Sequence, residues 1–182
     1  MKKVVVFFLA GFLALLARTL LFDHVTRWTP DLLLVVVVYL GIFRDPVKGL
    51  PLVFVLGGLA DVTANGGFVG LTSLIYLAVF MIARLTGRLF YARNPLIQGI
   101  IVAATGALHA VAAGVILHGY GVLPSAWPAH PAGAVVRALL AGLVAPAIFW
   151  ALFAVDAWIA PDEPRHRTIG RQASEWGEGW AR

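Results

Sequence analysis

The stretch that decides the fold runs from Pro30 to Tyr76 and reads PDLLLVVVVYLGIFRDPVKGLPLVFVLGGLADVTANGGFVGLTSLIY. Its apolar runs occupy residues 31–43 and 50–60, and a third run begins at residue 71 and continues to residue 83. The turns between them, at 44–49 and 61–70, hold charged, polar or glycine residues. Transmembrane helices are apolar along their length and are joined by polar turns. The pattern therefore predicts an array of membrane hairpins.

The composition of the chain indicates a lipid environment. Of its 182 residues, 60% are hydrophobic and 13% are charged, whereas a soluble domain carries about 25% charged residues. The net charge is +5, which basic cytoplasmic loops explain better than binding of nucleic acid does. The chain has no cysteine, which excludes disulfides, thiolate metal sites and a cysteine nucleophile.

Over the whole chain, the pattern predicts an all-α polytopic membrane protein with six transmembrane helices. Their expected positions are about residues 4–22, 29–43, 47–62, 69–83, 95–117 and 132–158. The fifth run is rich in alanine and glycine, so we expect it to approach its neighbours closely and to be central in the bundle. Residues 1–160 would form one domain, and the polar residues 161–182 a mobile cytoplasmic tail.

The second and third runs are shorter than the roughly 20 residues that cross a bilayer. They are either a re-entrant hairpin or two full spans that include flanking residues. The turn between them carries Arg44, Asp45 and Lys48, and burying these charges at the tip of a re-entrant loop would be costly. Two full spans, with the turn in cytoplasmic water, are therefore favoured.

The basic residues predict that both termini are cytoplasmic. With six spans, the inner side receives Lys2, Lys3, Arg44, Lys48, Arg84, Arg88, Arg93, Arg165, Arg167, Arg171 and Arg182. The outer side receives Arg18, Arg27 and Arg137. Because cytoplasmic loops are enriched in Lys and Arg, this asymmetry favours six spans in the cytoplasmic membrane.

Four ionisable residues are expected at a similar depth in the outer leaflet: Arg18, Asp31, Asp61 and Arg137. An arginine within a membrane is costly when it is alone and tolerable beside a carboxylate. One hypothesis is that the two arginines pair with the two aspartates and hold the helices together. The alternative is that each side chain extends independently to the outer interface.

Five glycines are candidates for contact with a partner helix, since glycine allows close approach of backbones. They are Gly57, Gly58, Gly66, Gly67 and Gly70. The first two could equally receive a neighbouring helix of the same chain, and the last three could form a tight outer turn. His109 is either part of a proton relay or, as we favour, an interhelical hydrogen-bonding residue.

The motifs of several enzyme classes are absent from the sequence. It has no glycine-rich phosphate loop followed by Lys and Ser or Thr, and no cluster of histidine and carboxylate with metal spacing. Ser73 and Ser125 lack the surroundings of a nucleophile. The sequence therefore predicts a protein without catalytic activity, cofactor or metal.

The motifs and their order resemble the rod shape-determining protein MreD family. The resemblance covers about residues 18–93 and is carried by Pro30-Asp31-Leu32, Gly57-Gly58-Leu59-Ala60-Asp61, Gly66-Gly67-Phe68-Val69-Gly70-Leu71 and Tyr76. It implies a non-catalytic scaffold of the cell-elongation machinery in the bacterial inner membrane. Such a protein would bind MreC and help couple MreB filaments to peptidoglycan synthesis by RodA and its class B transpeptidase.

The family's fold resembles the six-helix substrate-binding subunits of energy-coupling vitamin transporters, which supplies a second hypothesis. A solute-binding subunit would need a pocket with several convergent polar groups. The predicted spans contain few such groups, so a scaffold is favoured over a transporter subunit.

Overall fold

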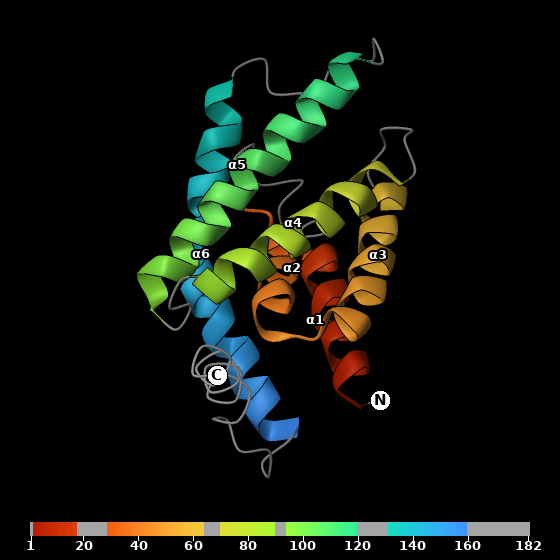
Figure 1. The fold of residues 1–182 in the computed structure, drawn as a ribbon, viewed down its shortest axis with the longest axis vertical. Coiled ribbons are helices and arrows are strands. Elements are labelled where there is room, and N and C mark those ends of the chain that lie inside the picture. The colour runs from red at the N-terminus through yellow and green to blue at the C-terminus, as the bar shows by residue number, and fades with distance from the viewer. Residues whose placement is uncertain (1, 18–28, 64–69, 90–93, 120–130, 160–182) are drawn as a thin grey trace, which may run out of the picture.

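The computed structural model describes residues 2–17, 29–63, 70–89, 94–119 and 131–159, and every element in these ranges is helical. The helices are α1 (Lys2–Ala17), α2 (Leu32–Phe43), α3 (Pro46–Thr63), α4 (Leu71–Leu89), α5 (Pro95–Gly119) and α6 (Pro131–Ile159). Figure 1 shows the start of α1, the turn between α2 and α3, and the end of α6 at one end of the bundle. The end of α3 and the start of α4 lie toward the opposite end.

Four of these helices are long and apolar enough to cross a membrane, namely α3, α4, α5 and α6. Their apolar segments contain between 18 and 27 residues, and roughly 20 residues are needed to span the hydrocarbon layer. The prediction of a helical membrane protein is therefore confirmed. The helices α1 and α2 are apolar but shorter, so the count of six spans stays a prediction.

The short helix α2 lies in the centre of the bundle. It packs against each of the other five helices, and its residues from Leu33 to Gly41 are all buried. With 12 residues, α2 is about 18 Å long, which is less than the thickness of the hydrocarbon layer. Because protein rather than lipid surrounds it, both of its ends can lie below the membrane surface if their backbone groups find partners.

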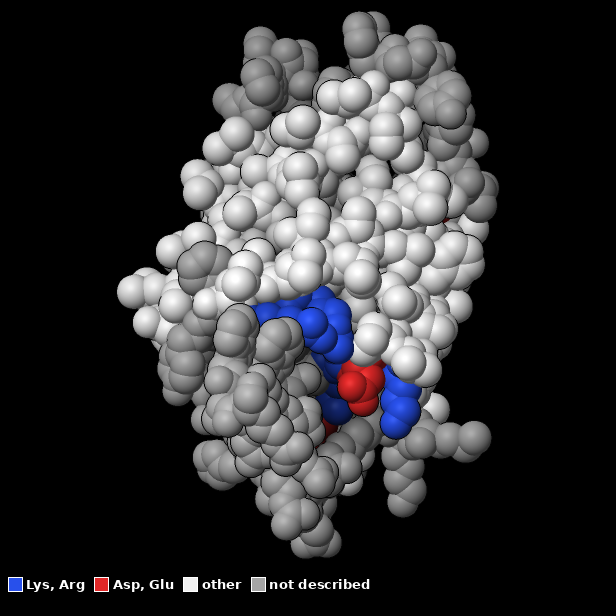
Figure 2. Space-filling view, viewed as in Figure 1, with Lys and Arg blue, Asp and Glu red and all other residues white. Residues whose placement is uncertain are grey.

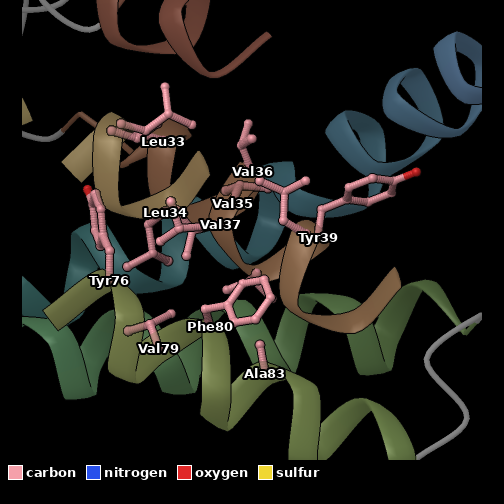
Figure 3. Packing of buried hydrophobic residues seen from close by; sticks show 14 of the residues in the cluster. Leu33, Leu34, Val35, Val36, Val37, Tyr39, Tyr76, Val79, Phe80 and Ala83 are labelled. Atoms are coloured by element: carbon pink, nitrogen blue, oxygen red, sulfur yellow. The ribbon is translucent and has the colours of Figure 1, made fainter. Parts of the chain in front are cut away.

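The principal partner of α2 is α4, as Figure 3 shows for Leu34, Val37, Val79 and Phe80. The two helices run parallel. The hydroxyl of Tyr76 reaches Asp31 near the start of α2, and Ile42 near its end contacts Gly87. At Gly41, a Cβ atom would lie 2.6 Å from the backbone oxygen of Phe80, so only glycine permits this approach.

The helix α5 is not the central helix that the sequence predicted. It does approach α6 closely, since a Cβ on Gly99 would lie 2.8 Å from the backbone oxygen of Gly142. The large side chains of Leu96, Ile100 and Val115, however, are exposed on its surface. The small residues of α5 therefore bring it close to α6. The centre of the bundle is occupied by α2, most of whose leucine and valine side chains are buried.

The helix α4 is longer than the predicted span, which ended at Ala83. It continues to Leu89 and so includes Arg84 and Arg88. The Arg84 side chain turns back to the bundle and donates a hydrogen bond of 2.8 Å to the backbone oxygen of Arg44.

Candidate functional site: two polar ends of the bundle

Asp61, near the end of α3, binds the start of α4. Its carboxylate accepts hydrogen bonds from the backbone N–H groups of Gly70 at 2.8 Å, Thr72 at 3.0 Å and Ser73 at 3.4 Å. Asp61 is only 8% exposed. The first N–H groups of a helix have no partner within the helix and carry a partial positive charge. A buried carboxylate at this place satisfies these donors and joins α3 to α4.

Two glycines near Asp61 allow this contact between α3 and α4. Gly70 has a φ of +103°, a conformation that favours glycine, and its N–H donates to Asp61. Gly57 lies one turn before Asp61, and a Cβ there would be 2.6 Å from the Cα of Ser73. Gly57 therefore contacts α4 of the same chain and has no space for a partner helix, which corrects the prediction for this residue.

The remaining glycine candidates differ from Gly57. A Cβ on Gly58 would lie 3.6 Å from the Ser73 hydroxyl oxygen, which is an ordinary contact. A Cβ on Gly70 would meet nothing within 4 Å. Gly66 and Gly67 lie outside the described residues. Contact of these four glycines with a partner stays a prediction.

Asp31 performs at α2 the task that Asp61 performs at α4. It is the N-cap of α2 and accepts a hydrogen bond of 3.2 Å from the N–H of Leu34. Its second oxygen accepts a hydrogen bond of 2.9 Å from the hydroxyl of Tyr76 on α4. Since Ser73 and Tyr76 are one turn apart, the first turns of α4 hold both carboxylates.

His109 on α5 contacts the same group of residues. Its ring stacks on the ring of Tyr76, with 5.2 Å between the ring centroids and 29° between the planes. Tyr76 is fully buried. The residues Asp31, Asp61, Tyr76 and His109 thus gather at one side of α4 and connect it to α2, α3 and α5. We call this group the carboxylate end.

Of the two arginines that were expected to pair with these carboxylates, only Arg137 lies in the described part of the chain. Among the described residues, no ion pair joins Arg137 to Asp31 or Asp61, and its Nε atom is buried without a hydrogen-bond partner in that part of the chain. Arg18 lies outside the described residues, so its pairing stays a prediction. The described bonds of both carboxylates come from uncharged donors.

The opposite end of the bundle contains an ion pair between Arg44 and Asp156, which lie 112 positions apart in the sequence. Their side chains are 19% and 32% exposed. The guanidinium of Arg44 also lies 4.3 Å from the centroid of the Phe7 ring. Together with the hydrogen bond that Arg84 donates, these contacts join the α2–α3 turn to α1, α4 and α6. We call Arg44, Arg84 and Asp156 the arginine end.

An aromatic cluster lies beside the ion pair. The ring of Tyr39 lies 5.8 Å from Phe7, 5.1 Å from Phe43, 5.4 Å from Phe149 and 5.3 Å from Phe153. Figure 3 shows the hydroxyl of Tyr39 directed away from α4. This cluster packs α1 and α6 against α2, and its edge-to-face contacts suit aromatic rings.

Charge on one face of the molecule is concentrated at this end. In Figure 2, the blue and red side chains of the described residues gather near the lower part of the view, and the surface above them is almost entirely uncharged. The basic residues of this end are predicted to be cytoplasmic, whereas the sequence predicted no role for Asp156. Asp156 is the only acidic residue in the predicted span 132–158, and this isolation could have identified it as half of an ion pair.

The described residues contain no group of three or more His, Asp or Glu side chains that could hold a metal ion. Comparisons with protein-family models, with curated proteins and with solved structures found no match for the chain.

Proposed function

We propose that this protein is a non-catalytic scaffold in the bacterial inner membrane, of the MreD type, that serves cell elongation. In this role it binds MreC and helps couple MreB filaments to peptidoglycan synthesis by RodA and its class B transpeptidase. The proposal depends on the resemblance of residues 18–93, and the geometry of the motif residues supports it.

The supporting observation is that the motif residues contact one another. Asp31 is bound by Tyr76, and Asp61 binds the first turn of α4 directly after Gly70. Gly57 lets that same turn approach α3. Residues that are dispersed over the motif thus form one packing unit of α2, α3 and α4. Such a use of carboxylates and glycines is structural, as a scaffold requires.

Site-specific photo-crosslinking tests the proposal in a rod-shaped bacterium that expresses the protein. A photoreactive residue at Leu139 or Leu143, which are 59% and 77% exposed on α6, or at Val111 on α5, can reach a partner helix. The same residue at Val37, which is fully buried, is the matched control. We expect a crosslink to a single-span membrane protein from at least one exposed position and none from Val37.

Two results would overturn the proposal. One is the absence of any protein crosslink from exposed positions on all of α3 to α6, combined with normal rod shape after the gene is deleted in its own host. The other is a small molecule that co-purifies in equal amount with the protein, which would favour the solute-binding subunit.

A further inference from the structure

Tyr39 of α2 is a fully buried tyrosine whose hydroxyl is not explained by the packing of the bundle. Its ring lies among the rings of Phe7, Phe43, Phe149 and Phe153, where a phenylalanine would fill the same space. The hydroxyl oxygen is shielded from solvent and has no hydrogen-bond partner in the described part of the chain. A buried hydroxyl without a partner is destabilising, and most buried polar groups bind another polar group or an ordered water molecule. The Tyr39 hydroxyl therefore indicates a polar ligand at this place.

The contacts of the Tyr39 ring show what its hydroxyl faces. Phe149, Phe153 and Asp156 follow one another on α6 at spacings of four and three residues, so they lie on one face of the helix. The Tyr39 ring contacts both phenylalanines of that face, and Figure 3 shows the hydroxyl directed away from α4. Asp156 and Arg44 both lie close enough to this hydroxyl to interact with it electrostatically. The hydroxyl thus lies beside the ion pair without a direct hydrogen bond to it.

The ion pair offers two further polar groups to a ligand. Its hydrogen bond joins Nη2 of Arg44 to Oδ1 of Asp156, so the second carboxylate oxygen, Oδ2, can accept another bond. The Nε–H group of Arg44 is buried and has no acceptor among the described residues. A donor, an acceptor and a hydroxyl, which can act as either, are therefore available beside one another.

These three groups select a small neutral ligand. An ion of either sign would lie beside a like charge, because Arg44 and Asp156 are both present. A ligand that satisfies all three groups must both accept and donate hydrogen bonds. A buried water molecule does so, and it typically makes about three hydrogen bonds to polar groups that lack other partners.

We propose that a water molecule binds at the arginine end, between α2 and α6. It accepts hydrogen bonds from the Tyr39 hydroxyl and from the Nε–H of Arg44, and it donates one to Oδ2 of Asp156. The side chains of Arg44 and Asp156 are 19% and 32% exposed, so the water can enter from the solvent beside the ion pair. This inference does not depend on the proposed scaffold function.

Radiolytic labelling of the whole chain in detergent tests the proposal. X-ray pulses split a bound water into hydroxyl radicals, which oxidise the side chain beside it, and mass spectrometry locates the added oxygen. We expect Tyr39 to be oxidised several-fold faster than Tyr76. Tyr76 is the matched control, because it is an equally buried tyrosine whose hydroxyl donates directly to Asp31.

Two variants each remove one partner of the water. Asp156→Leu replaces the acceptor by an apolar side chain, and Arg44→Lys keeps the positive charge but removes the Nε–H donor. Both should lower the oxidation rate of Tyr39 toward that of Tyr76, whose own rate should stay as in the wild type if the variant is folded. Arg44→Lys covers the case in which Asp156→Leu does not fold, since lysine can still pair with Asp156.

The stability of Tyr39→Phe gives a second measurement. Loss of a hydroxyl that binds water should lower the ratio of folded to unfolded protein about fivefold in an SDS titration. The loss should be smaller in the Arg44→Lys background, because the water is already bound more weakly there. The matched Tyr76→Phe substitution should cause the same loss in both backgrounds.

Three outcomes would overturn the proposal. The first is oxidation of Tyr39 as slow as that of Tyr76, which would show that no water contacts the Tyr39 hydroxyl. The second is faster oxidation of Tyr39 in Asp156→Leu or Arg44→Lys than in the wild type, which would indicate access of bulk solvent instead of a bound molecule. The third is a Tyr39→Phe variant at least as stable as the wild type, which would show that the hydroxyl has no partner.

Discussion

The carboxylate end and the arginine end both contain charged side chains within a membrane protein, but different groups bind these charges. At the first, Asp31 and Asp61 bind backbone N–H groups and a hydroxyl. At the second, Arg44 binds a carboxylate and an aromatic ring, while its own backbone oxygen accepts from Arg84. Among the contacts of the described residues, one end therefore pairs charge with backbone N–H groups and a hydroxyl, and the other pairs charge with charge.

The direction of the helices explains this difference. The parallel helices α2 and α4 both begin at the carboxylate end and end at the arginine end. Helix N-termini favour negative charge and C-termini favour positive charge. Asp31 and Asp61 thus lie where the dipoles of α2 and α4 favour them, and so do Arg44 and Arg88. Asp156 lies near the C-terminus of α6, where its charge is disfavoured, and so it needs Arg44.

The largest expected effect is at Asp61. Replacement of Asp61 by alanine leaves buried N–H groups of α4 without an acceptor, which should lower the free energy of unfolding by about 3 kcal/mol. Asp61→Asn keeps one acceptor oxygen and should lose less. Val62→Ala changes the neighbouring exposed residue and is the control. Unfolding by SDS titration measures the stability of all three variants. An Asp61→Ala variant as stable as Val62→Ala would show that the hydrogen bonds of Asp61 do not stabilise the bundle.

The next effect separates two adjacent glycines. Gly57→Ala should destabilise by about 2 kcal/mol, because its Cβ would overlap the backbone of α4 and the helices would have to move apart. Gly58→Ala places its Cβ at an ordinary distance from Ser73, and the better helix propensity of alanine should leave the protein at least as stable. The same SDS titration compares them, and equal effects would show that the α3–α4 contact does not limit stability.

At the arginine end, a double-mutant cycle of Arg44→Gln and Asp156→Asn should give a coupling energy of about 1 kcal/mol, because both side chains are partly exposed to solvent. Salt should reduce this coupling when its concentration is raised to about 0.5 M. The loss caused by Asp61→Ala should not change with salt, since Asp61 is buried. If salt changed the Arg44–Asp156 coupling energy and the loss caused by Asp61→Ala by the same amount, the predicted difference in electrostatics between the two ends would be wrong.

The smallest expected effect is at Tyr76. Tyr76→Phe removes the hydrogen bond to Asp31 and keeps the ring that stacks on His109, so the loss should be about 0.5 kcal/mol. The control is Tyr76→Leu, which also removes the stacking and should destabilise considerably more. Thermal unfolding in detergent can rank the two variants, and a loss in Tyr76→Phe as large as in Tyr76→Leu would mean that the hydroxyl dominates.

Much of the fold could be predicted from hydropathy, and the errors have physical causes. The described bounds of α3, α5 and α6 lie within two residues of the predicted spans, because the polar turns beside them are evident in the sequence. The helix α4 continues six residues beyond the predicted span, and the sequence does not tell whether an arginine there turns back to the bundle. The centre of the bundle was assigned to α5, because small residues allow close approach without specifying enclosure.

The candidate site was only partly predictable. Asp31 and Asp61 were identified because carboxylates in apolar surroundings are rare, yet all but one of their described donors are backbone N–H groups, which every residue except proline carries. Asp156 and Arg44 were not associated, because no local pattern joins residues that are 112 positions apart.

The sequence by itself determined that the chain is helical and belongs in lipid, since the length and polarity of its runs follow from the thickness and dryness of a bilayer. Tertiary structure alone decided which helix is enclosed and what each charge binds. The physical reason is that hydrophobicity acts on every apolar residue alike, whereas a hydrogen bond or an ion pair depends on the distance between two particular atoms, which exists only after the helices pack.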